Sequence, residues 1–101
     1  MDYITELNRI YVCDDSKMVA EVTFPMMDNN TVDINHTFVD ESYRGKGIAA
    51  KLLILAYETI KRQGYKAVPT CSYAVEFFKK YQEYQDILKW ELNRSHFLWN
   101  G

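Results

Sequence analysis

The pattern of apolar residues changes once along the chain, at Asp40, and this change limits the folds open to it. Before Asp40, apolar side chains recur at every second position; in residues 18–24, for example, Ala20 and Val22 face the same side. After a polar loop that contains glycine, residues 48–62 have the three- to four-residue spacing of an amphipathic helix. We therefore predict an α+β fold: an antiparallel β-meander, a helix, a short core strand and a second helix.

Clusters of Asp, Asn and Ser divide the first forty residues into strands, because these residues favour turns. The predicted strands are residues 9–13, 18–24 and 31–39. The third is read as one continuous strand, in which His36 shares an apolar face with Ile34 and Phe38.

The helix over residues 48–62 should stop near Gln63, because a glycine follows it. Residues 65–70 connect one helix to the next and are read as a short buried strand. A second helix is predicted over residues 73–85, with Ser72 as its N-cap. The tail over residues 86–101 carries three large aromatic residues and should pack on the body or on a partner, since such surface is costly to expose. These residues are Trp90, Phe97 and Trp99.

One domain is expected over residues 1–101, because a chain of 101 residues has the size of a single core. Twelve basic and 14 acidic side chains give a net charge of −2, which does not favour nucleic acid or an anionic membrane as a partner. The longest apolar run, residues 48–56, is far shorter than the roughly 20 residues of a bilayer span. The chain begins with acidic residues and without the apolar segment of a signal peptide, so we expect a cytosolic protein.

The two cysteines, Cys13 and Cys71, belong to no CxxC or Cys/His spacing, and no metal site is predicted. In a reducing compartment each is expected to be a free thiol, either packed or reactive. Cys13 lies in an ordinary strand and is read as a packing residue.

The loop at residues 44–49, Arg-Gly-Lys-Gly-Ile-Ala, follows a strand and opens a helix. Glycines in that position expose backbone N–H groups to an anion at the positive end of the helix dipole. The spacing fits neither a P-loop nor a dinucleotide-binding fingerprint. From these six residues alone, a phosphate site and a helix-capping turn that binds nothing both stay open.

The R-x-x-G-x-A pattern of Arg44, Gly47 and Ala49 resembles the acyl-CoA pyrophosphate loop of the GCN5-related N-acetyltransferase superfamily. Taken with residues 36–39 and 69–74, it resembles the short, YjdJ-type, GCN5-like N-acetyltransferases. The resemblance covers residues 10–87 and implies a minimal form of the superfamily's fold.

The resemblance implies that acetyl-CoA lies between the strand ending at Val39 and the strand ending near Thr70. The backbone near Val39 would bind the pantetheine arm, and the loop would bind the pyrophosphate. The implied loop residues are Arg44, Gly45, Lys46, Gly47, Ile48 and Ala49.

Other members of the superfamily carry an Asn-x-x-Ala-x-x-x-Tyr pattern whose tyrosine protonates the departing CoA thiolate. Here the same frame reads Cys71, Ala74 and Phe78, so the phenol is missing. Cys71 precedes a predicted helix, where the helix dipole favours a thiolate that could accept the acetyl group. The alternative is that Cys71 is a small buried apolar residue.

Two further residues are candidates for catalysis. His36 could act as a general base or as the partner of the thiol, since imidazole exchanges protons near neutral pH; alternatively it is a packed residue of an apolar face. Tyr73 could supply the absent phenol, or simply pack in the first turn of the helix.

The sequence thus predicts an acetyl-CoA-dependent N-acetyltransferase that acts on an unidentified amine or other nucleophile, with an acetyl-Cys71 intermediate as one route. The alternative is a non-catalytic module that binds acyl-CoA or is itself acetylated and bound by a partner. A third hypothesis is an interaction protein whose loop is purely structural. The acceptor and the oligomeric state are not specified by the residues.

Overall fold

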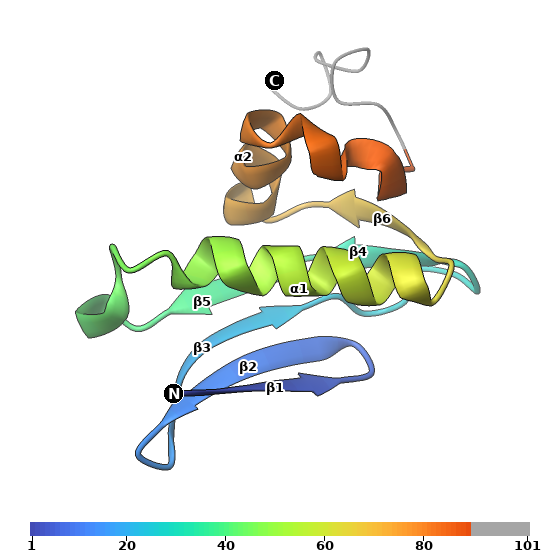
Figure 1. Cartoon of the computed structure of the whole chain (residues 1–101). Coiled ribbons are helices and arrows are strands. Elements are labelled where there is room, and N and C mark those ends of the chain that lie inside the picture. The colour runs from blue at the N-terminus through green and yellow to red at the C-terminus, as the bar shows by residue number, and fades with distance from the viewer. Residues whose placement is uncertain (90–101) are drawn as a thin grey trace.

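A computed structural model describes residues 1–89 of the protein (Figure 1). These residues form two α-helices, two short 3-10 helices (η1 and η2) and two sheets. The larger sheet has four strands in the order β1-β2-β3-β5, and the smaller pairs β4 with β6. The elements are β1 (Asp2–Glu6), β2 (Arg9–Asp14), β3 (Lys17–Thr23), β4 (Thr31–Ile34), β5 (His36–Val39), η1 (Glu41–Tyr43), α1 (Ile48–Arg62), β6 (Lys66–Pro69), α2 (Ser72–Lys80) and η2 (Gln82–Ile87).

The predicted meander is confirmed, and it forms the four-stranded sheet. All neighbouring strands in it are antiparallel, with Ile10 opposite Val22 and Val12 opposite Ala20. These four side chains are fully buried. They lie on the face that α1 covers, because residues directly opposite each other in a sheet point to the same side. Leu52, from α1, is likewise completely buried in this core.

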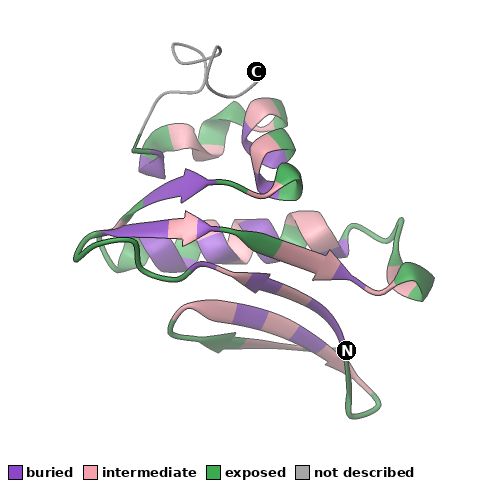
Figure 2. Cartoon of the chain, turned by 180° about the vertical axis from the view of Figure 1, so that it is seen from behind, coloured by how far each residue is buried: buried purple, intermediate pink, exposed green. Residues whose placement is uncertain are grey.

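Figure 2 shows the sheet from the side opposite α1, and no element of residues 1–89 covers this face. The residues that alternate with the buried ones, such as the paired Tyr11 and Glu21, are half-buried. The sequence prediction begins at Arg9 and does not include β1, which pairs with β2 along its whole length. As an edge strand it has no buried residue, so its alternation is weak.

The prediction of one continuous strand over residues 31–39 is wrong. The chain changes partners at Asn35: β4 runs parallel to β6, whereas β5 runs antiparallel to β3. The carbonyl of Ile34 accepts hydrogen bonds from the backbone of Thr70 and Cys71, at 3.0 and 3.3 Å. Because the break resets the alternation, Ile34 is fully buried while the side chain of His36 is 53% exposed. His36 therefore does not share the face of Ile34.

The first helix and the strand after it are confirmed. α1 ends at Arg62, and Gly64 follows with a φ of +77°. β6 lies within the predicted strand and is buried from Ala67 to its end at Pro69. The apolar character of this short segment is explained by its place between β4 and the last described residues, where Leu88 bridges to Ala67.

The second helix begins and ends earlier than predicted. Its N-cap is Cys71 rather than Ser72, because the Cys71 sulfur accepts the backbone N–H of Ala74. The helix ends at Lys80, and Tyr81 leaves the helical conformation before η2. The side-chain amide of Gln85 donates to the carbonyl of Phe78 at 2.7 Å and holds η2 against the helix.

The predicted packing of Trp90, Phe97 and Trp99 concerns residues outside the described part of the chain. Within residues 1–89, neither helix has the length and the run of apolar residues needed to cross a bilayer.

Candidate functional site

The polar loop between β5 and α1 is shaped by one capping residue and two glycines. Asp40 caps η1 by accepting hydrogen bonds from the backbone N–H and the hydroxyl of Ser42, at 3.0 and 3.1 Å. The bond from the Ser42 backbone is the main reason why the pKa of Asp40 lies below its usual range. Gly45 and Gly47 then adopt φ values of +79° and +77°. This left-handed region is unfavourable for residues with a Cβ, so the loop conformation requires glycine at both positions.

The start of α1 is open toward solvent. Gly47 is the N-cap of the helix, and no side chain forms a capping hydrogen bond there. A Cβ placed on Gly45 or Gly47 would meet nothing within 4 Å, so there is free space above both residues. The first N–H groups of a helix have no partner within the helix. These donors at the opening turn of α1 are therefore available to an anion, and the helix dipole favours negative charge at the same place.

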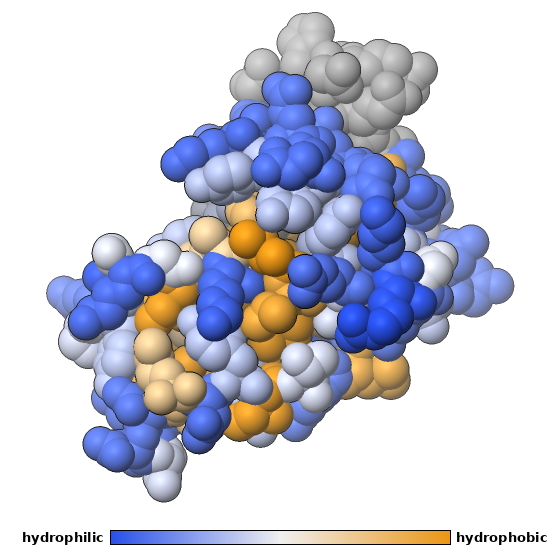
Figure 3. All heavy atoms as spheres, in the orientation of Figure 1, coloured by the Kyte–Doolittle hydropathy of each residue, from blue (hydrophilic) through white to orange (hydrophobic). Residues whose placement is uncertain are grey.

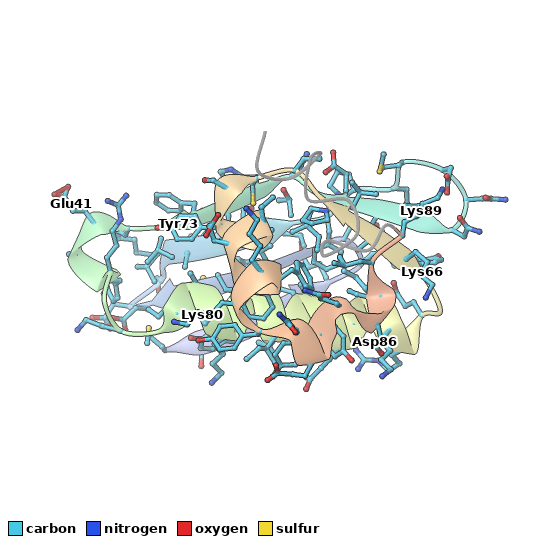
Figure 4. The ribbon with its side chains drawn as sticks, turned by 90° about the horizontal axis from the view of Figure 1, so that it is seen from above. Glu41, Lys66, Tyr73, Lys80, Asp86 and Lys89 are labelled. Atoms are coloured by element: carbon cyan, nitrogen blue, oxygen red, sulfur yellow. The ribbon has the colours of Figure 1, made fainter. Side chains whose placement is uncertain are left out.

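A cleft of about 120 Å³ lies between this loop, the end of β5 and the first turn of α2. A second hollow of about 230 Å³ continues from it between α1 and α2 and shares Ala49, Ala50 and Tyr73 with the cleft. In the space-filling view, apolar atoms gather in this region over α1 (Figure 3). Tyr73 and Lys80 lie on the side of α2 that faces the loop with Glu41 (Figure 4). The cleft is lined by Val39, Tyr43, Arg44, Gly45, Gly47, Ile48, Ala49, Ala50 and Tyr73.

The structure thus brings most of the predicted loop residues to one cleft. Lys46 is the exception, because it is exposed in the loop and does not line the cleft. The side chain of Arg44 donates from Nε to the carbonyl of Val39 at 3.1 Å, which ties the loop back to the end of β5. Three lining residues are absent from the predicted loop set. Tyr43 and Ala50 adjoin the motif directly, and Tyr73 comes from α2.

Cys71 lies where the two sheets part. β5 is paired on one side with β3 and is the last strand of its sheet, while β6 ends at Pro69. The sulfur of Cys71 lies 3.4 Å from Thr37 Oγ1 and 3.4 Å from the Ala74 nitrogen. The thiol is half-buried and unpaired with the other free cysteine of the described chain, Cys13.

His36 points to the opposite face of the sheet from Thr37, because side chains alternate along a strand. Its Nε2 lies 3.6 Å from Oε1 of Glu21, and the other carboxylate oxygen of Glu21, Oε2, binds the Arg9 guanidinium. The β5 residue that contacts Cys71 is Thr37 and not His36. The predicted pairing of His36 with the thiol is therefore not present in this structure.

The model of one known family, described as GCN5-related N-acetyl-transferase, matches residues 9–87 of the chain. The protein belongs to this family. GCN5-related N-acetyltransferases use acetyl-CoA as the acyl donor and a second substrate as the acceptor.

Comparison with individual members supports this assignment. Protein NATD1 of Danio rerio is 36% identical over 61 residues, which cover 60% of this chain and 56% of that protein. The chain thus spans about half the length of the curated relatives it matches. The solution NMR structure of a GCN5-like protein from Staphylococcus aureus is 31% identical, with a TM-score of 0.72 over 86% of each chain. An aminoglycoside N-acetyltransferase in complex with CoA shares the fold alone, with 16% identity and a TM-score of 0.50 over 82% of this chain and 59% of that one.

The position at which the superfamily pattern has its tyrosine is occupied by a core residue. Phe78 is fully buried and packs edge-on against Phe77, with ring centroids 5.2 Å apart. Tyr73 instead supplies a phenol at the cleft, where it is 43% exposed. The described part of the chain brings together no group of three or more His, Cys, Asp or Glu side chains that could hold a metal ion.

Proposed function

We propose that this protein binds acetyl-CoA in the cleft beside α1 and transfers the acetyl group to an amine. The observation that carries the proposal is the loop that leads into α1. Gly45 and Gly47 adopt positive φ angles there, and no atom lies within 4 Å of the position that a Cβ would occupy on either residue. Backbone N–H groups in this arrangement suit a diphosphate, which is the most highly charged part of the ligand. The membership of the chain in an acetyl-CoA-dependent family supports the same ligand.

From the loop, the pantetheine arm would run along the free side of β5 toward Cys71. The carbonyl of Val39 already accepts the Arg44 bond, so a further bond from pantetheine would use its second lone pair or a neighbouring backbone group. Tyr73 borders the cleft from α2 and would flank the arm. The resemblance to the YjdJ-type subfamily, and the cytosolic location expected from the sequence, are part of this proposal.

One route of transfer passes through Cys71. Its thiolate would attack the carbonyl carbon of the thioester, the carbon–sulfur bond to CoA would break, and CoA would leave as a thiolate that takes up a proton. An amine acceptor would then attack acetyl-Cys71, lose a proton, and release the Cys71 thiolate. The Ala74 N–H donates to the sulfur in this structure, and the Thr37 hydroxyl lies 3.4 Å from it, where it can donate to a thiolate. Donors of this kind stabilise a thiolate more than a thiol.

The second route is direct transfer from acetyl-CoA to the acceptor, with the Tyr73 phenol protonating the departing CoA thiolate. The exposure of Tyr73 at the cleft favours this residue over Phe78, which is buried and has no hydroxyl. The burial of Phe78 also favours the alternative function, a non-catalytic module that binds acyl-CoA or becomes acetylated itself.

Intact mass after incubation with acetyl-CoA separates these hypotheses. Transfer through the thiol predicts an added acetyl group that is absent in Cys71→Ala and retained in Cys13→Ala, since Cys13 is also a free, half-buried thiol. Calorimetric titration with CoA tests binding separately. Binding without an acetyl adduct, and without CoA release in the presence of amines, would support the non-catalytic module; an absence of CoA binding would contradict the proposal.

A further inference from the structure

The hairpin turn between β2 and β3 contacts the loop over residues 40–47, which we call the glycine loop, through two side-chain pairs. The Tyr43 hydroxyl donates a hydrogen bond to Asp14 Oδ2 at 2.6 Å. Lys17, on the other side of the turn, forms an ion pair with Asp40, with 3.4 Å between Nζ and Oδ2. The hairpin therefore holds the loop at two residues, Asp40 and Tyr43.

The backbone of this turn is unusual. Asp15 and Ser16 have φ values of 52° and 66°, and they are the non-glycine residues with positive φ in residues 1–89. A two-residue turn of this kind normally takes Asn-Gly, because both positions lie in the left-handed region. The register of the hairpin also shifts between Val12 and Cys13, just before Asp14. Unfavourable backbone of this type persists where surrounding contacts require it, often at functional sites.

Tyr43 links the cleft to the hairpin turn. It lines the cleft, while its hydroxyl reaches Asp14, a residue that does not line the cleft. The hydrogen bond to Asp14 is the main reason why the pKa of Tyr43 is raised, so the phenol stays a donor over a wider pH range. Asp14 thus contacts a residue of the cleft without lining the cleft itself.

We propose that Asp14 and Tyr43 are positioning residues for the diphosphate of coenzyme A, which hold the glycine loop in the conformation that turns its backbone amides toward the cleft. The inference rests on the proposed function above. Asp14 would act without touching the ligand, and its removal would change CoA affinity in the direction opposite to that expected from its charge alone. A carboxylate near an anion site repels the anion, so removal of Asp14 would strengthen CoA binding if charge alone mattered. Removal weakens binding if Asp14 positions the loop.

Calorimetric titration of CoA into Asp14→Ala and Tyr43→Phe tests this difference. We expect each variant to bind CoA about 3- to 10-fold more weakly, the range that corresponds to the net contribution of one typical intramolecular hydrogen bond. The double variant should be no weaker than either single one, because both changes remove the same contact. Tyr43→Phe leaves every charge and the ring in place, so it provides the test even if Asp14→Ala folds poorly.

Asp15→Asn is the matched control. It removes the same charge from the same turn and keeps a residue that tolerates positive φ. The hydrogen bond and the ion pair to the loop are made by Asp14 and Lys17 and are left in place. CoA affinity should be unchanged or slightly higher in this variant. Pantetheine, which lacks the diphosphate, should bind all four variants as it binds the unsubstituted protein, when followed by NMR chemical shifts.

CoA affinity that is unchanged or increased in both Asp14→Ala and Tyr43→Phe would overturn the inference while leaving the proposed function intact. Equal weakening of CoA and pantetheine would overturn it as well, since that result indicates general loss of structure. Failure of the unsubstituted protein to bind CoA would instead refute the proposed function, and this inference with it.

Discussion

Thr37 Oγ1 lies 3.4 Å from the sulfur of Cys71, although the two residues are 34 positions apart in the sequence. Thr37 belongs to β5, and Cys71 caps the helix that follows β6, so their contact crosses the place where the two sheets part. The sulfur also accepts the N–H of Ala74. The Cys71 sulfur therefore lies between the Thr37 hydroxyl and a backbone donor at the start of a helix.

Thr37→Val should lower the reactivity of Cys71. Valine keeps the shape of threonine but removes the hydroxyl that can donate to a thiolate, and we expect alkylation by iodoacetamide at neutral pH to slow by roughly 2- to 5-fold. The rate is measured by intact mass in a Cys13→Ala background. Thr23→Val is the control, because the Thr23 hydroxyl bonds Asn35 and not the thiol. Alkylation at an equal or higher rate in Thr37→Val would show that the hydroxyl does not activate the sulfur.

Gly47→Ala should weaken CoA binding beyond its effect on stability. The alanine meets no neighbouring atom, but at a φ of +77° it costs roughly 1–2 kcal/mol of folding free energy and shifts the backbone of the loop. Gly64→Ala carries the same φ and the same open space at the other end of α1. Thermal unfolding should show similar destabilisation of both variants, while calorimetry should show reduced CoA affinity in Gly47→Ala alone. Equal CoA affinity in the two variants would argue against the loop as the diphosphate site.

Phe78→Tyr should not restore the tyrosine chemistry of the superfamily. Phe78 is fully buried, so the added hydroxyl would enter an apolar core and cost about 1–3 kcal/mol if it finds no partner. We expect a lower free energy of unfolding in urea and no faster release of CoA from acetyl-CoA. An unchanged stability together with faster CoA release would mean that the phenol reaches the cleft.

Stability should fall in acid. Three carboxyl groups have a lowered pKa, each mainly because of one contact. Asp28 and Asp40 accept a backbone N–H, from Asn30 and Ser42 respectively. Asp86 accepts a hydrogen bond from the side chain of Lys61. A carboxyl whose pKa is lower in the folded state than its value of about 3.9 in unfolded chains stabilises the fold above that pH and ceases to do so as the pH falls through the folded value.

Urea unfolding between about pH 2 and pH 7 should therefore show a loss that begins near pH 4. Asp86→Asn removes the ion pair with Lys61, in which 2.8 Å separate the two charged groups. The variant should be less stable than the unsubstituted protein at neutral pH, and the two curves should converge in acid. Parallel curves over the whole range would show that this pair does not contribute to the acid transition.

Local patterns predict the elements whose structure depends on nearby residues. α1 and its end before Gly64 follow from helical periodicity and a glycine that adopts positive φ. The same holds for the first hairpin strands and for the glycine loop, since Gly45 and Gly47 adopt the backbone for which glycine is suited. The presence of Phe78 in place of a tyrosine likewise follows from the residue pattern alone.

The amino-acid sequence by itself determined the hairpin of β2 and β3, the helix α1 and the loop that opens it, because these features follow from interactions between residues a few positions apart. Only the tertiary structure decided the break at Asn35, since β4 takes its partner β6 from a segment more than thirty positions later. That choice of partner turns His36 away from Cys71, brings Thr37 to the sulfur, and leaves the free side of β5 open. The pairing of Tyr43 with Asp14 is of the same kind, because the loop and the hairpin meet only when the sheet has formed.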